Sequence, residues 1–437
     1  MNPIVSACFG EEEMSQQPFK GLNVVEFGQF VAVPVAAQLL ADGGAEVVKV
    51  EPLSGDPMRS AGTVGGGESR HFICRNNGKH CLPLDLGNAA AKPVIEALIK
   101  KADVVLMNFR PGLAEKMGIA PGQLLERYPR LIIGSVSGYG NAGPEASNVG
   151  QDVVVQARSG LMAANGRIID GRPAACETAS VDTMAGVTLA FGILSALLRR
   201  ERTGAGGIIE TSLLQAAMSM SSTQLAKADR DAVEHAKMLE QLAAKRASGA
   251  SYAEQLASVQ PAELALLTRM MNVYYTTFAT QDSFIAIACG SRSLQTKFGE
   301  VLGIVDVGLT RDFAGDRLTY YSNLASQVEQ LIARQSSDHW VTLLRKSGIP
   351  VSKVYLPIEL SDDEQINANK MFHRFEHPLV GAMTIVGPPL SLDDDGFRAG
   401  QPTNPLGSES EKILLQLGLS EQEINGLMAA GISHKGL

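Results

Sequence analysis

Residues 21–51 read GLNVVEFGQFVAVPVAAQLLADGGAEVVKVE, and this stretch decides the fold class. Leu22–Phe27 is a short apolar run, which predicts a buried strand. An Ala- and Leu-rich helix is expected over Ala32–Ala41, because Pro34 is well tolerated in a first helical turn. Glu46–Val50 predicts a second strand. A strand, a helix and a strand with short connections are typical of a parallel sheet covered by helices.

The same alternation continues along the chain as far as residue 222. It predicts helices over 89–101, 113–117, 183–200 and 212–222, and strands over 103–107, 131–135 and 207–211. Residues 223–268 are rich in Ala, Gln, Lys and Glu, and we interpret them as solvated helices that link two domains. Val273–Ala288 then predicts a β-hairpin in a second domain. Helical patterns follow over 294–302, 322–335, 339–347, 409–417 and 421–429.

Composition and charge exclude several function classes. The chain has 437 residues, of which 45% are hydrophobic and 19% charged, as in an ordinary soluble protein. The net charge of −8 gives no electrostatic reason to bind nucleic acid. Five scattered cysteines without a CxxC pair indicate reduced thiols in a cytoplasmic protein. The N-terminal residues lack the basic and apolar regions of a signal peptide, and no stretch is long enough to span a bilayer, so we expect no membrane partner.

Metal binding has little support in the sequence. The seven histidines form no HExxH motif. His373 and His377 are four residues apart and could share a helix face, but surface positions before Pro378 are the simpler interpretation. We therefore predict no metal site.

Two turns that follow predicted strands could meet a ligand. Gly28–Pro34 joins a strand to a helix, which is where doubly wound sheets bind anions through backbone amides. The GxGxxG and Walker A motifs are absent, which disfavours a nicotinamide enzyme and a nucleotide hydrolase. Asn108–Gly112 could hold an adenine or a phosphate, although a turn with a surface arginine is an equally good interpretation.

Asp182 lies in the run Glu177-Thr-Ala-Ser-Val-Asp-Thr-Met-Ala-Gly186, close to the start of the long predicted helix. One interpretation is a helix N-cap, a common role for aspartate. The other is a catalytic carboxylate. The two roles conflict, because a carboxylate that caps a helix is stabilised and is a poorer nucleophile. The residues around Asp182 leave both interpretations open.

From about Gly21 to its C-terminus the sequence resembles the family III CoA-transferases, of the formyl-CoA transferase and carnitine CoA-transferase type. Each segment that carries the resemblance is short, but their order along the chain is highly specific. The segments are Gly21–Phe27, Leu40–Glu51, Gly55–Pro57, Lys79–Asp85, Ala102–Gly112, Lys116–Gly118, Ser137–Gly140, Gly143–Pro144, Gln156–Met162, Gly192–Arg199, Thr203–Gly206, Gly348–Pro350 and Leu406–Ser410.

The resemblance implies a set of functional residues. Asp182 matches the aspartate that is the covalent nucleophile in that family. The positions that match the family's coenzyme A site are Val31, Ala32, Leu84, Asp85, Asn108, Phe109, Arg110, Lys116, Gln151 and Asp152. Lys116 replaces the usual arginine, which keeps the charge but loses the planar fork. Pro52 and Gly87 stand where some members carry cations.

One departure separates two reactions on this scaffold. The related α-methylacyl-CoA racemases carry a catalytic histidine in a Gly-His-Asp run, whereas this chain has Gly150-Gln-Asp152. Glutamine cannot shuttle a proton as imidazole does. Three interpretations are kept, in this order: a CoA-transferase, an acyl-CoA racemase or isomerase, and a non-catalytic CoA-binding protein in which Asp182 only caps a helix.

The resemblance also implies the architecture and the chemistry. We expect an α/β fold, with a large Rossmann-like domain and a smaller α+β domain, in an interlocked homodimer. The expected segments are a leader over 1–20, the large CoA-binding domain over 21–222, a helical linker over 223–268, the small domain over 269–375, and a return linker with the C-terminal part of the large domain over 376–437. Coenzyme A would be a substrate, with no tightly bound cofactor, and the partners would be an acyl-CoA and a carboxylic acid. The amide of Thr183 is a candidate donor to the oxyanion.

Overall fold

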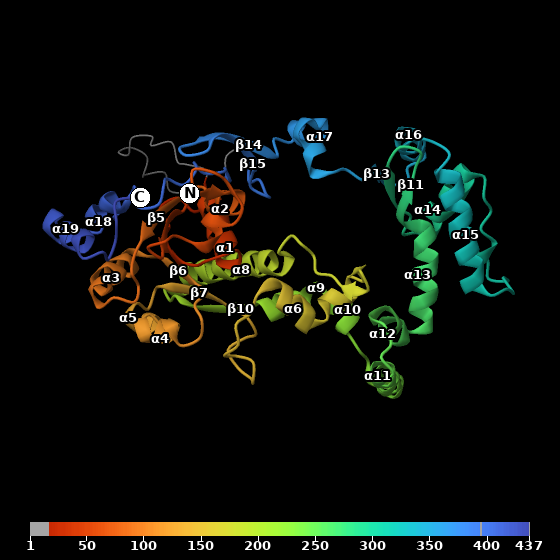
Figure 1. The fold of residues 1–437 in the computed structure, drawn as a ribbon, viewed down its shortest axis with the longest axis horizontal. Coiled ribbons are helices and arrows are strands. Elements are labelled where there is room, and N and C mark those ends of the chain that lie inside the picture. Colours follow the sequence, from red (N-terminus) through yellow and green to blue (C-terminus); the bar gives the residue numbers. More distant parts are fainter. Residues whose placement is uncertain (1–16, 394–395, 437) are drawn as a thin grey trace, which may run out of the picture. The chain divides into compact units, whose positions relative to one another are not determined.

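The computed structural model describes residues 17–393 and 396–436. Most of the predicted leader, and Cys8, lie outside the described residues. Contacts divide the chain into two units, Met1–Lys227 with Ile366–Leu437 and Ala228–Gln365 (Figure 1). Each unit is described by itself. Phe19, which the leader prediction included, belongs to the first unit: its amide donates to the Gly43 carbonyl, and its ring meets that of Phe397 at 5.8 Å.

The first unit is built on a sheet of six parallel strands, which confirms the predicted α/β class. The strands are β1 (Asn23–Phe27), β2 (Glu46–Glu51), β5 (Lys79–Pro83), β6 (Val104–Met107), β7 (Ile132–Ser137) and β10 (Gly207–Ser212). Their order across the sheet is β10-β7-β6-β1-β2-β5. The order reverses between β1 and β6, as in doubly wound nucleotide-binding folds, and such a reversal opens a crevice at the carboxyl ends of the strands.

Two apolar clusters cover the two faces of this sheet. On one face, α1 (Ala32–Asp42) and α8 (Ser180–Thr203) pack together (Figure 1). Gly186 allows their close approach, because a Cβ atom there would lie 2.5 Å from the Ala32 carbonyl oxygen. On the other face, α3 (Lys92–Lys101), α18 (Ser410–Gln416) and α19 (Glu421–Ala429) supply the buried side chains. The C-terminal segment therefore completes a core that the N-terminal half begins.

The remaining elements of the first unit are short. They are β3 (Thr63–Gly65), β4 (Glu68–Ser69), α2 (Arg70–Asn76), α4 (Leu113–Met117), α5 (Pro121–Arg127), α6 (Asp152–Ser159), α7 (Leu161–Ala164), β8 (Ile168–Ile169), β9 (Arg172–Pro173), α9 (Leu213–Met220), α10 (Ser222–Leu225), β14 (Phe372–His377) and β15 (Gly381–Val386). His373 and His377 lie on strand β14 and not on a helix, and His377 is buried rather than on the surface. Within the described residues no group of three or more potential ligands could hold a metal ion.

Helix α8 differs from its prediction in two ways. It begins at Ser180 and not at Thr183, so Asp182 lies inside its first turn. It is also long and apolar enough to cross a membrane by length and composition, with a mean hydropathy of 1.8 over 18 residues, which corrects the expectation that no stretch is long enough. Its buried residues pack in the core of the first unit against α1 and the sheet, as those of a core helix do.

The second unit combines a small antiparallel sheet with helices. The predicted hairpin is confirmed by β11 (Tyr275–Ala279) and β12 (Phe284–Ala288), with β13 (Val351–Lys353) beside them. Strand β11 begins later than predicted. Val273 and Tyr274 are the last two residues of the preceding helix, and their side chains are buried there. The helices are α11 (Ala232–Ala247), α12 (Tyr252–Ser258), α13 (Ala262–Tyr274), α14 (Arg292–Leu302), α15 (Arg317–Ile332), α16 (Ser337–Lys346) and α17 (Glu364–Ala368), of which α17 straddles the division between the units.

Candidate active site

The turns after β1 and β6 meet at the reversal of strand order. The Asn108 side chain accepts a hydrogen bond from the Gln29 amide at 3.1 Å and donates one to the Gln29 carbonyl at 2.9 Å. The rings of Phe27 and Phe109 are 5.8 Å apart. The structure therefore brings together two segments that the sequence singled out, 28–34 and 108–112, at the edge where such sheets bind ligands.

Helix α1 opens at this edge without a side-chain cap. Its N-cap is Val31, no side chain bonds to its first amides, and its first turn contains no acidic residue. Val31 and Ala32 are buried, so any contact with a ligand would come chiefly from their backbone. An uncapped helix start with a positive dipole suits an anion such as a phosphate.

A buried cluster of charges fixes the turn that leads into α1. The Lys49 ammonium lies 3.0 Å from both Glu26 and Asp56, and it donates to the Gly28 carbonyl at 2.6 Å. Asp56 in turn accepts a long hydrogen bond, 3.5 Å, from the amide of Phe30, whose φ of 66° is rare for a side chain of this size. Burial would lower the pKa of Lys49, but Glu26 and Asp56 outweigh burial and raise that pKa. The turn is therefore held from beneath by paired charges.

A second cation and an arginine complete the cluster. Lys79 lies 2.9 Å from Glu26 and donates to the Pro34 carbonyl at 2.9 Å; burial lowers its pKa to about 8. The Arg59 guanidinium donates two hydrogen bonds of 2.8 Å to the Glu51 carboxylate and also pairs with Glu68. Burial would raise the pKa of Glu51, but Arg59 outweighs it and the pKa is lowered.

Asp182 is held near a second carboxylate, that of Asp152. One oxygen of Asp152 accepts hydrogen bonds from the amides of Val181 at 2.8 Å and Asp182 at 3.0 Å. Asp152 follows Gly150, which touches Gly138: a Cβ atom on Gly150 would lie 2.5 Å from the Gly138 Cα atom. Two glycine-containing motifs of the sequence thus meet to place Asp152 at the start of α8.

The carboxylate of Asp182 itself has no hydrogen-bond or ion-pair partner among the described residues. Burial raises its pKa to about 7, Asp152 adds to the rise, and Arg75 on α2 opposes it. The N-cap of α8 is Ala179, in a left-handed conformation with φ of 49°. The capping interpretation of Asp182 is therefore wrong, because Asp152 supplies the cap from outside the helix. The Thr183 amide donates to the Ala179 carbonyl at 3.0 Å, so this amide is not free to bind an oxyanion.

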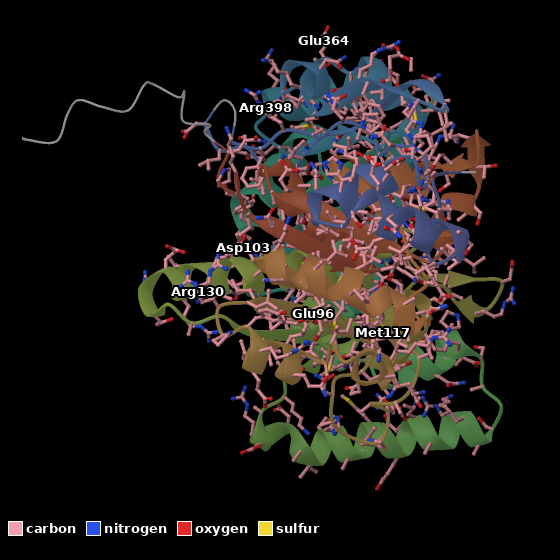
Figure 2. The ribbon with its side chains drawn as sticks, turned by 90° about the vertical axis from the view of Figure 1, so that its left-hand side faces the viewer. Glu96, Asp103, Met117, Arg130, Glu364 and Arg398 are labelled. Carbon is pink, nitrogen blue, oxygen red and sulfur yellow. The ribbon has the colours of Figure 1, made fainter. Side chains whose placement is uncertain are left out.

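The other predicted site residues are spread over several elements of the first unit. Leu84 and Asp85 follow β5; Leu84 is buried, and the Asp85 amide donates to the Ile432 carbonyl. Arg110 is exposed, and Gln151 is the exposed N-cap of α6. Lys116 lines a separate cavity of about 280 Å³ together with Glu96 and Met117, which lie near each other in Figure 2.

The sequence interpretation missed three features of the site. Gln156 was quoted only as part of a motif, yet its buried side chain bonds both Asp152 and the backbone of Cys176. Arg75 was not considered. The ion cluster was also missed, although Lys49 and Asp56 stand in segments that carried the resemblance, and charged residues on a strand expected to be buried were the signal.

Both the sequence and the fold are similar to those of known proteins. A model of the family described as CoA-transferase family III matches residues 19–409. Acetyl-CoA:oxalate CoA-transferase of Acetobacter aceti is 30% identical over 392 residues, which cover 88% of this chain and 92% of the relative. Probable fatty acyl-CoA transferase Rv3272 of Mycobacterium tuberculosis is 32% identical over 339 residues, 76% of this chain and 81% of the relative. The orthorhombic crystal structure of Rv3272 matches with a TM-score of 0.72 at 27% identity, over 92% of this chain and 100% of that one.

Proposed function

The chain belongs to CoA-transferase family III, and from this premise we propose that it moves coenzyme A from an acyl-CoA to a carboxylic acid through covalent intermediates on Asp182. The observation that carries the proposal is the state of the Asp182 carboxylate. It lies beside the sheet edge that suits an anionic ligand, its pKa is raised, and no described residue bonds to it. A carboxylate with this freedom can attack a thioester directly once it is ionised.

The proposed reaction begins with two exchanges at carbonyl carbons. An oxygen of Asp182 attacks the thioester carbon, the carbon–sulfur bond breaks, and CoA thiolate leaves behind a mixed anhydride. The thiolate then attacks the aspartyl carbon of the anhydride, which releases the donor acid as a carboxylate. The product of this half-reaction is an aspartyl-CoA thioester.

The second half-reaction repeats these exchanges with the acceptor. The acceptor carboxylate attacks the aspartyl thioester and displaces CoA thiolate, which forms a second anhydride. The thiolate attacks the acceptor's acyl carbon and restores the Asp182 carboxylate. The anhydrides hydrolyse readily, so the reaction requires that water be kept from this position.

The coenzyme A site is proposed at the reversal of strand order. Backbone amides at Val31 and Ala32, the uncapped start of α1 and the exposed Arg110 would face the anionic nucleotide. Asn108 would act mainly by holding the turn, since both ends of its amide already bond to Gln29. Asp85 and Gln151 remain proposed contacts, as do Leu84, Phe109 and Lys116 by resemblance.

The acids that exchange coenzyme A stay open within carboxylic acids. The names of the relatives range from an oxalate transferase to a probable fatty acyl transferase. A panel that pairs acetyl-CoA with small dicarboxylates and long-chain acids would identify the preferred class through the new thioester formed.

A homodimer is proposed with the function. Helix α8 exposes an apolar stripe in which Phe191 is 71% exposed and Leu198 is 55% exposed, flanked by Val187 and Leu194. These positions recur every three or four residues, so they form one face of the helix. The stripe supports the proposed dimer, because exposed apolar patches are typical of protein contacts and the family resemblance implies a dimer. Phe191→Lys should shift the mass in solution from dimer to monomer, as measured by light scattering.

Trapping of the acyl-enzyme tests the proposed function most directly. The protein is incubated with an acyl-CoA and then with hydroxylamine, which converts an aspartyl thioester or anhydride into a hydroxamate. Mass spectrometry should place the modification on Asp182, and Asp182→Asn should give none. Turnover that continues in Asp182→Asn would refute the role of Asp182 as nucleophile. Loss of an α-deuteron from the acyl-CoA without CoA transfer would favour the racemase.

A further inference from the structure

The first turn of α8 is capped by a residue from another helix. A helix leaves its first amides without partners, and the side chain of the N-cap residue commonly bonds them. Here the amides of Val181 and Asp182 both donate to one oxygen of Asp152, which opens α6. Asp152 therefore takes the place of the missing N-cap side chain and holds the backbone of Asp182 directly.

Gln156 fixes the carboxylate that forms this cap. Its amide nitrogen donates to the other oxygen of Asp152 and to the Cys176 carbonyl, and its oxygen accepts from the Cys176 amide at 3.0 Å. Gln156 is completely buried. Both oxygens of Asp152 are thus engaged within the protein, and the segment that leads into α8 is tied to the same side chain.

Asp182 is left on the ligand-facing side of its helix. Asp182 and Gly186 are four residues apart, so they share one face of α8. At Gly186 that face touches the Ala32 carbonyl, at the uncapped start of α1. The carboxylate without a partner therefore lies on the side of α8 that meets the proposed coenzyme A site.

We propose that Asp152, fixed by Gln156, is a positioning residue for CoA transfer: by accepting the backbone amides of Val181 and Asp182 it holds the first turn of α8, and with it the unpaired Asp182 carboxylate, in place for attack on the thioester. The inference rests on the proposed function of Asp182. It replaces the role as a coenzyme A contact that the resemblance implied for Asp152, because both oxygens of Asp152 bond to groups within the protein.

The charge of Asp152 acts on Asp182 in the same direction as the geometry. Asp152 and Arg75 are the charged groups that act on the Asp182 carboxylate, and burial with Asp152 outweighs Arg75, so the pKa is raised to about 7. A more basic carboxylate is a better nucleophile once it is ionised. The cost is that part of the enzyme is protonated at neutral pH, so the rate falls as the pH falls through 7.

Asp152→Asn tests the proposal because it removes the charge but keeps an oxygen that can accept the two amides. The pKa of Asp182 should fall, so the acid limb of the pH–rate profile should move to lower pH. We expect kcat on the alkaline plateau to fall roughly three- to tenfold, following the loss of basicity, with KM for acyl-CoA unchanged. Asp152→Ala, which also frees the amides, should lose more activity.

The control is Asp103→Asn, because Asp103 directly precedes β6 and so lies at the amino ends of the strands, away from the proposed site. Asp103 also accepts a backbone amide, that of Asn23 at 3.1 Å, and it pairs with Arg200. This variant should lower the melting temperature without moving kcat or the acid limb. If Asp152→Asn behaves in the same way, Asp152 is only a helix cap and the proposal fails. If KM rises tenfold while kcat and the acid limb stay in place, Asp152 is a coenzyme A contact and the proposal also fails.

Two measurements on the unmodified protein keep the outcomes distinct. Carbodiimide labels protonated carboxyl groups, and mass spectrometry should show labelling of Asp182 that declines with a midpoint near pH 7. A midpoint close to the ordinary range of aspartate would overturn the inference even if the Asp152 variants do not fold. Absence of a hydroxamate on Asp182 after an acyl-CoA and hydroxylamine would instead refute the proposed function.

Discussion

Two carboxylates of the first unit, Glu51 in the ion cluster and the half-buried Asp182 at the start of α8, are held in opposite ways. In the ion cluster beneath the β1 turn, Arg59 binds Glu51 through two hydrogen bonds, and the pKa of Glu51 is lowered. At the start of α8, Asp182 has no bonding partner among the described residues, and its pKa is raised to about 7. A paired carboxylate contributes to the position of the backbone, whereas an unpaired one keeps its reactivity. Within one fold, the paired Glu51 therefore stabilises the backbone, and the unpaired Asp182 is available for the reaction.

The largest expected effect comes from Asp182→Asn. Activity should fall by on the order of ten-thousand-fold, the scale seen when a nucleophile is removed. Stability should change in the opposite direction. A carboxyl group whose folded pKa is raised costs stability that grows as the pH rises from its ordinary value toward about 7. The variant should therefore melt higher than the wild type above pH 7 and equally near pH 4, and a lower melting temperature at pH 8 would contradict an unpaired carboxylate.

Arg59→Met should produce the largest loss of stability. It leaves Glu51 buried without its cation, and removal of one partner of a buried pair costs about 3–5 kcal/mol. Urea unfolding at neutral pH measures the loss. The control combines Arg59→Leu and Glu51→Leu with Glu68→Gln, because this set leaves neither buried carboxylate without its cation. A triple variant as unstable as Arg59→Met would show that pairing is not the reason.

The pH dependence of turnover should give an intermediate effect. Asp182 must be ionised to attack, so the rate should fall about tenfold for each pH unit below about 7. Turnover with a saturating acceptor acid whose own pKa is below 5 isolates this limb. A rate that is constant from pH 8 to pH 5 would show that the pKa of Asp182 is not raised, so that Asp182 would be ionised over this range as Glu51 is.

Glu96→Gln should give the smallest effect. Glu96 accepts hydrogen bonds from Tyr128 and Arg127, which lower its pKa, but its side chain is 46% exposed. Exposed pairs contribute from about 0 to 1 kcal/mol, and a lowered pKa means that this contribution is lost as the pH falls below the ordinary range of glutamate. Thermal unfolding at pH 7 and pH 3 should show a small difference that disappears at the lower pH.

The order of strands and helices in the first unit could be predicted because it depends on local apolar runs. The start of α8 could not, since it depends on a contact with Asp152, 30 residues earlier in the chain, and on a left-handed Ala179 that no local signal announces. Strand β5 was missed because Lys79 and His80 make its beginning polar; the partner that buries Lys79, Glu26, stands on another strand. The site residues could be named from the resemblance, but which of two aspartates caps the helix needed the fold.

The C-terminal segment, residues 401–433, has a consequence for how the protein is made. It lies along β5 at the edge of the sheet: Gln401 accepts the Gly78 amide, Glu409 bonds His80, and the Ser433 hydroxyl bonds the Pro83 carbonyl. All six strands leave the ribosome well before this segment does. An uncovered edge strand invites pairing with other chains. During synthesis strand β5 therefore stays uncovered until the whole second unit has been translated. This interval is when chaperones would matter most.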